Sequence, residues 1–231
     1  ACIMRHLLLA AATVLVLALP ALGQGTFLPL ATGNTWTYFS DYGEETTEII
    51  GQTDQFGPQV WVKEVLVSPE NEGLQNMWTS STEEGVFLHG FWRGWGYFYD
   101  PPIKVADADM TLGDTWSTTV DFYTLPDMTY AETHTLSFEV YEEGIVAVPA
   151  GEFLAYGVGG ALPPALERDG ATYTLSGERR RPGSRNADSW WSLGVGEVQY
   201  SGYGFNVLHP YAVQTVPTER RNWSDVKALF D

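Results

Sequence analysis

The stretch Ser189–Tyr200 (Ser-Trp-Trp-Ser-Leu-Gly-Val-Gly-Glu-Val-Gln-Tyr) constrains the fold more than any other part of the chain. It combines two adjacent tryptophans, a Gly-Val-Gly turn and a returning Val/Tyr strand. A sheet element with this much aromatic surface has to bury one of its faces. The stretch therefore predicts a β-sheet protein, with Trp190 and Trp191 in its core.

Alternating apolar and polar residues predict strands along most of the chain. Trp36 and Tyr38 alternate with threonines after a Gly-Asn turn, which is the pattern of a half-buried strand. Asp54–Pro58 has the composition of a turn between two such runs. The other predicted strands span residues 45–51, 59–68, 74–81, 85–89, 135–141, 145–148, 154–158 and 171–177, with 204–208 as a closing strand.

The triplet Glu-Glu-Gly occurs at residues 83–85 and again at residues 142–144, each time between alternating apolar runs. Glycine adopts the positive φ that ends a short hairpin, and the glutamates remain in solvent. Both triplets are therefore predicted to be hairpin tips. The alternative, a general acid/base pair, is disfavoured because neighbouring residues of a strand point to opposite faces.

The charge balance excludes several classes of partner. The 231 residues include 12 Lys+Arg against 29 Asp+Glu, for a formal net charge of -17. Nucleic-acid binding needs a basic face, and an anionic membrane surface repels an acidic protein. The single cysteine, Cys2, precedes the apolar N-terminal run, so no disulfide and no thiolate metal site is expected beyond it.

The first residues have the order of a secretory signal peptide. Met4-Arg5-His6 is basic, Leu7–Leu19 is apolar, and Pro20–Gly23 supplies the small residues that a signal peptidase reads. The apolar run is shorter than the roughly 20 residues of a membrane span. We therefore predict a signal peptide at residues 1–23, with residues 1–3 upstream of the natural start, and export to a periplasm or the extracellular space. No transmembrane segment is expected after it.

Gly90–Tyr99 (Gly-Phe-Trp-Arg-Gly-Trp-Gly-Tyr-Phe-Tyr) is the most aromatic segment of the chain. Its interleaved glycines indicate a loop or a bent, exposed strand. Exposed rings can stack on sugar rings or cover an apolar ligand, and an arginine beside them adds a cation–π contact. The alternative is a hairpin that folds its rings onto the core. The predicted ligand-binding residues are Phe91, Trp92, Arg93, Trp95, Tyr97 and Tyr99.

Groups for metal binding or catalysis are sparse. Asp107, Asp109 and Asp114 could hold calcium, but they lack a spaced loop ending in a bidentate glutamate. No histidine after the signal peptide has a second ligand at the helical spacing of a zinc site. Leu175-Ser176-Gly177 lacks the first glycine and the helix of a nucleophile elbow, and Gly94-Trp95-Gly96 opens no phosphate-binding helix. We therefore expect no cofactor, no metal site and no catalytic residue.

Two segments near the C-terminus differ from the rest. Residues 178–185 are rich in arginine, and a solvated loop that neutralises nearby carboxylates is favoured there over an anion site. Residues 222–230 begin with a capping residue and place apolar side chains at helical spacing. The predicted organisation is a β domain at residues 25–215, then a linker and a short amphipathic helix at 216–231. That helix is either a cap on the sheet or a docking tag.

Four segments resemble, in order and spacing, a family of secreted, largely uncharacterised bacterial β proteins. They lie at residues 27–38 (FLPLATGNTWTY), 99–116, 148–153 (VPAGEF) and 190–198 (WWSLGVGEV). The resemblance implies a strongly curved antiparallel sheet, similar to the half-barrels of periplasmic lipoprotein carriers. The shared residues are glycines, prolines and aromatics, which specify turns and core, so the resemblance carries over no catalytic residue.

Together these observations predict an all-β fold, a single curved antiparallel sheet (half-barrel or open barrel) with a short C-terminal helix. The predicted role is non-enzymatic binding of an apolar ligand, a glycan or an envelope partner. The first alternative is an extracellular glycan hydrolase, which needs two carboxyl groups about 5–10 Å apart in a cleft. The second is a purely structural surface protein, which needs no cleft.

Overall fold

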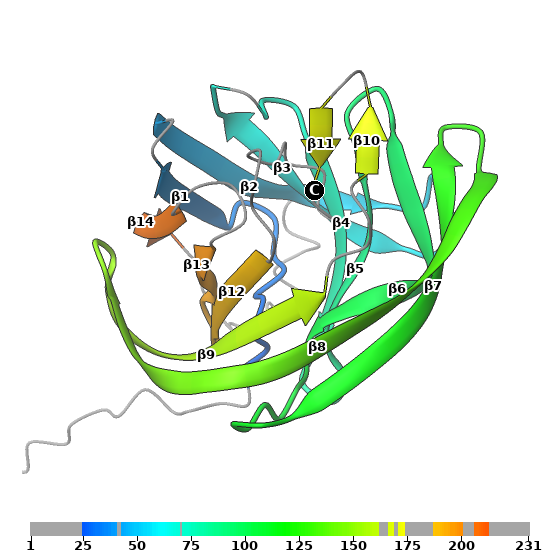
Figure 1. The fold of residues 1–231 in the computed structure, drawn as a ribbon. Helices are drawn as coiled ribbons and strands as arrows, with labels where there is room; N and C mark the ends of the chain where they lie inside the picture. Colours follow the sequence, from blue (N-terminus) through cyan, green and yellow to red (C-terminus); the bar gives the residue numbers. More distant parts are fainter. Residues whose placement is uncertain are drawn as a thin grey trace, which may run out of the picture.

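The computed structural model describes residues 25–40, 43–69, 71–161, 166–168, 171–173, 187–200 and 206–212. All of the regular elements in these ranges are β-strands, and no helix occurs among them (Figure 1). The strands are β1 (Thr35–Ser40), β2 (Gly43–Thr53), β3 (Val60–Val67), β4 (Gln75–Ser81), β5 (Gly85–Trp92), β6 (Gly96–Ala106), β7 (Thr115–Leu125), β8 (Thr129–Val148), β9 (Gly151–Ala161), β10 (Leu166–Arg168), β11 (Ala171–Tyr173), β12 (Ala187–Ser192), β13 (Gly196–Tyr200) and β14 (Asn206–Ala212).

The strands β1 to β9, β12 and β13 form one curved antiparallel sheet. Its end strands, β1 and β13, do not pair with each other within the described residues, so these eleven strands alone leave the sheet open. β14 fills the gap, since it pairs with β13 through Gln199 and Tyr200 and with β1 along Thr35–Phe39. With β14 included, every strand of this sheet is paired on both sides, and the sheet closes into a barrel. β10 and β11 form a separate two-stranded sheet.

The predicted all-β class and the curved antiparallel sheet are confirmed. The predicted closing strand at 204–208 overlaps β14, which spans the gap that a half-barrel would leave open. The signal peptide, the arginine-rich segment and the C-terminal helix lie outside the described residues, and the domain boundaries stay a prediction.

The two Glu-Glu-Gly triplets differ in structure. Residues 83–85 do form a hairpin tip, because β4 ends at Ser81 and β5 begins at Gly85, whose φ is 99°. The same prediction was wrong for residues 142–144, which lie inside the long strand β8. The predicted strands at 135–141 and 145–148 are therefore one strand, interrupted only by a register shift between Val140 and Glu142. Pairing of Gly144 with Ala155 of β9 keeps it extended.

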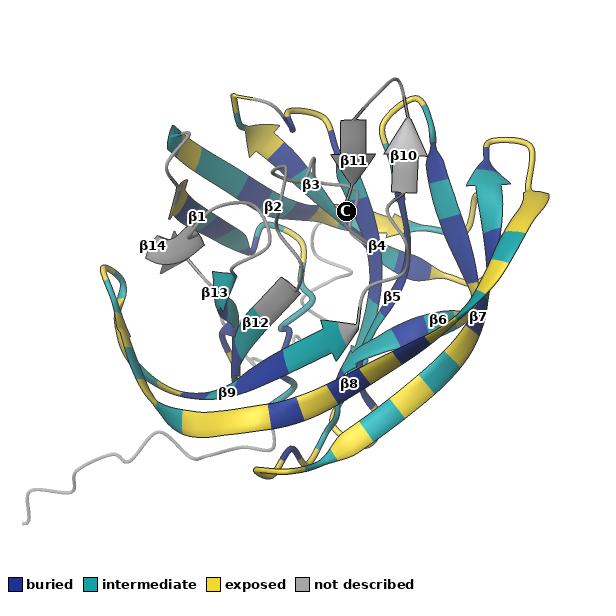
Figure 2. Ribbon diagram, viewed as in Figure 1, coloured by how far each residue is buried: buried dark blue, intermediate teal, exposed yellow. Residues whose placement is uncertain are grey.

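The main core lies inside the curved sheet. Buried side chains from strands all around it form one cluster, which includes Trp36, Ile49, Tyr99, Phe122 and Val198. Figure 2 shows the corresponding pattern along β8, where exposed bands alternate with buried ones. A strand with one face on the core and one in solvent gives this alternation.

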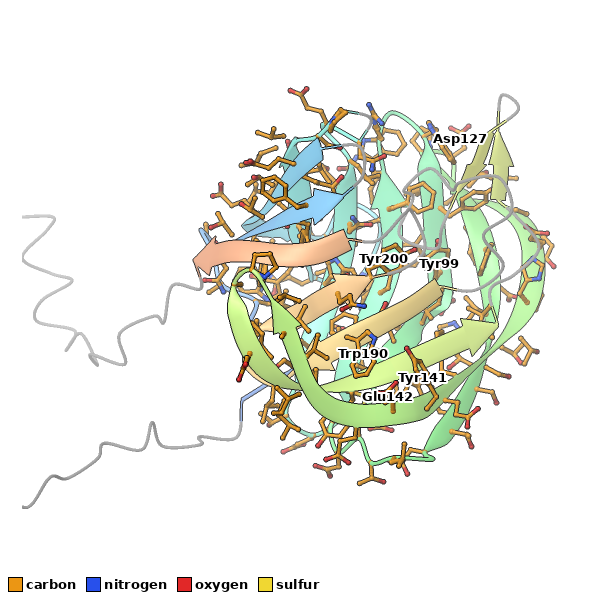
Figure 3. The ribbon with its side chains drawn as sticks, turned by 60° about the vertical axis from the view of Figure 1, so that its left-hand side comes forward. Tyr99, Asp127, Tyr141, Glu142, Trp190 and Tyr200 are labelled. Carbon is orange, nitrogen blue, oxygen red and sulfur yellow. The ribbon has the colours of Figure 1, made fainter. Side chains whose placement is uncertain are left out.

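The expected core role of the hairpin at 189–200 is confirmed for Trp191, which is buried, while Trp190 is half-buried against the same core. Figure 3 shows Trp190 beside Tyr141 of β8, and the two rings meet edge to face with centroids 6.0 Å apart. The hairpin is thus packed against β8 and β9 as well as against the N-terminal strands.

Candidate functional site

The segment Gly90–Tyr99 forms the end of β5, a short turn and the start of β6. Its glycines permit close backbone packing. A Cβ at Gly90 would lie 2.2 Å from the carbonyl oxygen of Tyr97, and one at Gly96 would lie 1.8 Å from that of Phe91. The segment is therefore a tightly packed hairpin.

The sheet divides the predicted ligand-binding residues between its two faces. Phe91 and Tyr99 are fully buried in the main core, each at 0% exposure. Trp95 and Tyr97 are half-buried against that core, and their rings meet Phe91 at centroid distances of 5.3 and 5.9 Å. These four rings thus pack onto the protein's own core. Arg93 lies exposed in the turn, where its backbone N–H donates to the carbonyl of Trp95.

Trp92 lies on the opposite face. It pairs with Gln75 and Gly96 across the sheet, and directly paired residues project to the same side. A second buried cluster forms on this face, and it includes Phe98. Phe98 points away from the main core because its neighbours in β6, Tyr97 and Tyr99, point toward it. This outer-face cluster consists of Val60, Met77, Phe98 and Leu125, with Phe56, Trp92 and Tyr123 packed against it.

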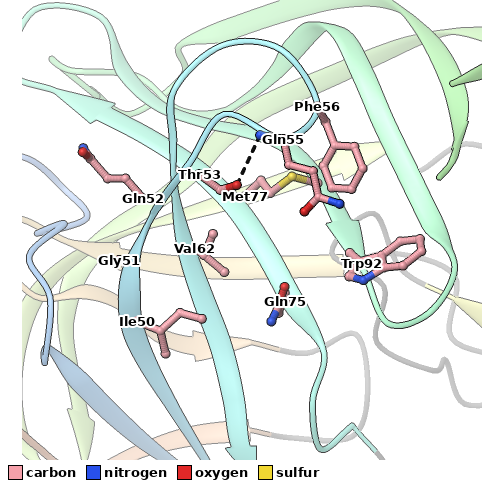
Figure 4. Close-up of a pocket in the computed structure, with 10 residues that line it drawn as sticks. All are labelled: Ile50, Gly51, Gln52, Thr53, Gln55, Phe56, Val62, Gln75, Met77 and Trp92. Carbon is pink, nitrogen blue, oxygen red and sulfur yellow. Dashed lines mark hydrogen bonds between the residues drawn. The ribbon is translucent and has the colours of Figure 1, made fainter. Parts of the chain in front are cut away.

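A pocket opens beside this outer-face cluster (Figure 4). Its volume is about 180 Å³. One wall comes from β2, another from β3 and β4, and the loop between β2 and β3 contributes Phe56. The described lining residues are Ile50, Gly51, Gln52, Thr53, Gln55, Phe56, Val62, Gln75, Met77 and Trp92.

The lining combines two rings with neutral polar groups. The rings of Phe56 and Trp92 lie 6.0 Å apart at 48°. The side-chain amides of Gln55 and Gln75 accompany them. Gln52 also borders the pocket, but its side chain projects to the other face with that of its cross-strand partner Trp61 (Figure 4). All ten described lining residues are uncharged at neutral pH. Such a mixture of apolar walls and a few polar groups is typical of small-molecule sites.

Local hydrogen bonds hold the polar part of the pocket in place. The amide nitrogen of Gln75 donates to the carboxylate of Glu64 at 2.8 Å, which fixes the amide and leaves its carbonyl oxygen and second N–H for other partners. The backbone N–H of Gln55 donates to the hydroxyl of Thr53 at 3.2 Å, which shapes the turn that carries Phe56.

His89 is a buried titratable group close to the outer-face cluster. Its Nε2 shares a 2.9 Å hydrogen bond with the hydroxyl of Thr79, and its ring lies 6.4 Å from that of Phe98. Burial lowers the pKa of His89 from 6.5 to about 4, because the charged imidazolium loses its hydration. His89 is therefore neutral at physiological pH and acts as a structural group.

Of the residues predicted from sequence to bind a ligand, Trp92 lines this pocket, and the other lining residues were not among those predicted. Phe56 lies in the segment 54–58, which was read only as a turn. A large aromatic residue in an otherwise polar turn was the available signal, since such a ring needs a surface to cover it. The glutamines carried no comparable signal, because pairing of β2, β3 and β4 brings them together.

The aspartates considered for calcium have turn roles. Asp107 forms an ion pair with Lys104 at 3.3 Å and accepts the backbone N–H of Ala108. Asp114 accepts the backbone N–H of Thr111 at 2.7 Å. Within the described part of the chain, no three His, Cys, Asp or Glu side chains gather as a metal site would require. The same part of the chain contains no helix with the length and apolarity of a membrane span.

No protein-family model matches the chain, and no curated protein matches it. Two solved structures are similar. One is a presumed exported protein with a YmcC-like fold from Bacteroides fragilis, with 15% identity, a TM-score of 0.46, and coverage of 82% of this chain and 100% of that one. The other is a presumed lipoprotein from Parabacteroides distasonis, with 11% identity, a TM-score of 0.36, and coverage of 81% and 99%.

Proposed function

We propose that the chain is an exported, non-catalytic binding protein and that the outer-face pocket at Trp92 is its ligand site. The observation that supports this most is the convergence of Trp92 and Phe56 with the amides of Gln55 and Gln75 around a volume of about 180 Å³. Partly exposed rings beside neutral hydrogen-bonding groups suit the recognition of a small uncharged molecule.

The chemistry of the pocket supports binding over hydrolysis. A glycan hydrolase needs a pair of carboxyl groups flanking the bond that it cleaves. The described lining contains amides, a hydroxyl and apolar groups, and none of its ten residues has a carboxyl side chain. Glu64 is engaged with the amide of Gln75 at the edge of the pocket.

The proposal also refines the predicted set of binding residues. Trp92 is retained as a ligand-contacting residue, because its half-buried ring lines the pocket. Phe91 and Tyr99 have no surface left for a ligand, since both are fully buried. We therefore assign Trp92 and Phe56, from two separate hairpins, as the aromatic pair of the site.

The test is a titration of the purified protein with the neutral apolar dye N-phenyl-1-naphthylamine and with neutral oligosaccharides. Dye emission and intrinsic tryptophan emission report binding. Trp92→Ala and Phe56→Ala should each weaken binding by about tenfold or more, since each removes a ring that contacts the ligand. Tyr141→Ala is the matched control, because Tyr141 is 39% exposed in β8 and its ring contacts Trp190, away from the outer-face cluster.

Circular dichroism and the melting temperature establish that each variant is folded, and Trp92→Phe keeps an aromatic ring should Trp92→Ala not fold. No response to either kind of probe, or equal binding by Trp92→Ala and the parent protein, would overturn the proposal.

A further inference from the structure

We infer that the pocket recognises one sugar ring of a neutral glycan; this rests on the proposed function of the same pocket and names its ligand class. The first observation is size. A volume of about 180 Å³ is below the roughly 300–1,000 Å³ of sites for drug-sized molecules. It therefore accommodates one ring of a longer chain better than a whole lipid or a large cofactor.

The second observation is the pairing of rings with amides. A sugar ring has an apolar C–H face that can lie against an aromatic ring, and Trp92 and Phe56 provide such surfaces. Its hydroxyls both donate and accept hydrogen bonds. Side-chain amides do the same, because each has two N–H donors and a carbonyl acceptor. Gln55, exposed at the rim, and Gln75, on the pocket wall, match this requirement.

Gln75 adds directionality to the site. One N–H of its amide is committed to Glu64 at 2.8 Å, which fixes the amide and leaves its carbonyl oxygen and its second N–H to meet a ligand hydroxyl. A purely apolar ligand would leave these amides without compensation for their lost water, which costs free energy for each buried polar group. The polar share of the lining thus favours a hydroxyl-rich ligand over a hydrocarbon.

The third observation is charge. The described lining is neutral, Glu64 borders it, and the chain has a formal net charge of -17. An anionic sugar would approach against this field and would find no cation in the described lining to pair with. A neutral sugar meets no such penalty.

The test is isothermal titration of the purified protein with neutral hexasaccharides of glucose, mannose, galactose and N-acetylglucosamine, with oligogalacturonate as the anionic counterpart. N-phenyl-1-naphthylamine and tetramethylammonium serve as the apolar and cationic probes. A single small ring gains limited binding energy, so dissociation constants on the order of 1 mM are expected for the best hexasaccharide.

The amide pair Gln55→Ala/Gln75→Ala should weaken binding of that hexasaccharide by about tenfold, because it removes hydrogen bonds to the hydroxyls. Dye binding should change less than about twofold. Gln59→Ala is the matched control, since Gln59 is an exposed amide of the same loop outside the described lining.

The possible results are distinguishable. Binding of a neutral hexasaccharide that depends on the amide pair and on Trp92, but not on Gln59, supports the inference. Binding of the dye or of tetramethylammonium alone overturns the sugar assignment and leaves the pocket as a binding site. Tighter binding of oligogalacturonate also overturns it. Absence of binding by every probe overturns both the inference and the proposed function.

Discussion

The indole N–H of Trp36 donates a 2.7 Å hydrogen bond to the carbonyl of Val195, 159 residues later in the chain. Trp36 lies in β1, and Val195 is the central residue of the Gly-Val-Gly turn between β12 and β13. Both residues are buried. This bond therefore ties the first strand to the last part of the sheet, close to the gap that β14 fills.

Trp36→Phe is expected to destabilise the protein by about 1–3 kcal/mol beyond its loss of packing, because the buried carbonyl of Val195 loses its donor. Trp78→Phe is the control. Trp78 is also buried, and its indole N–H finds no partner among the described residues, so this change removes packing without removing a known bond. Urea unfolding of both variants measures the difference, and equal losses would show that the Trp36 bond contributes nothing.

The two Glu-Glu-Gly triplets give opposite expectations for the same substitution. Gly85→Ala should destabilise by about 3 kcal/mol or more, because its φ is +99° and a Cβ would lie 2.2 Å from the carbonyl oxygen of Ala106. Gly144→Ala should be neutral or stabilising by about 0.5–1 kcal/mol, since a Cβ there meets nothing within 4 Å and alanine suits a strand better.

Thermal unfolding of the two alanine variants checks this pair. A marked loss of stability for Gly144→Ala would contradict the continuous strand β8 and would restore the hairpin tip at residues 142–144.

Protonation of His89 should make stability depend on pH. Its pKa is about 4 in the folded protein against 6.5 for an unperturbed histidine. The unfolded chain therefore binds more protons between these values, so stability is complete above about pH 6.5 and decreases as the pH falls toward 4. The loss attributable to this group is about 3 kcal/mol.

His89→Gln removes the titrating ring while leaving a side chain that can bond to Thr79. Urea unfolding at several values between pH 4 and pH 7 should show a shallower pH dependence for this variant than for the parent protein. Parallel curves for the two proteins would mean that His89 is not kept neutral by burial.

Sequence patterns predicted the fold class well because alternation reports directly on half-buried strands. The aromatic hairpin at 189–200 and the tip at Gly85 follow from local composition and turn chemistry, and the closing strand predicted at 204–208 overlaps β14. The second Glu-Glu-Gly triplet was misread because pairing with β9 keeps Gly144 extended, and that partner lies outside any local window.

The candidate site was only partly predictable, for a reason visible at Phe91 and Trp92. These neighbours point to opposite faces, and a register shift between Leu88 and Gly90 changes which residues of β5 meet the core. Local sequence shows that one of two adjacent rings is buried without showing which. Phe56 follows β2 and Trp92 lies in β5, and these strands are separated in the sheet by β3 and β4. The contact between the two rings therefore depends on how the four strands are arranged, which local sequence does not show.

The most direct test of the ligand site is the response of individual indole groups. In ¹H–¹⁵N spectra of the protein with labelled tryptophans, Trp92→Phe identifies the Trp92 indole signal among the nine tryptophans. Titration with the best-binding hexasaccharide should shift the Trp92 signal and leave those of Trp95 and Trp190, which pack on the main core, nearly unchanged. Saturable binding that moves Trp95 or Trp190 while Trp92 stays fixed would contradict the outer-face pocket as the ligand site.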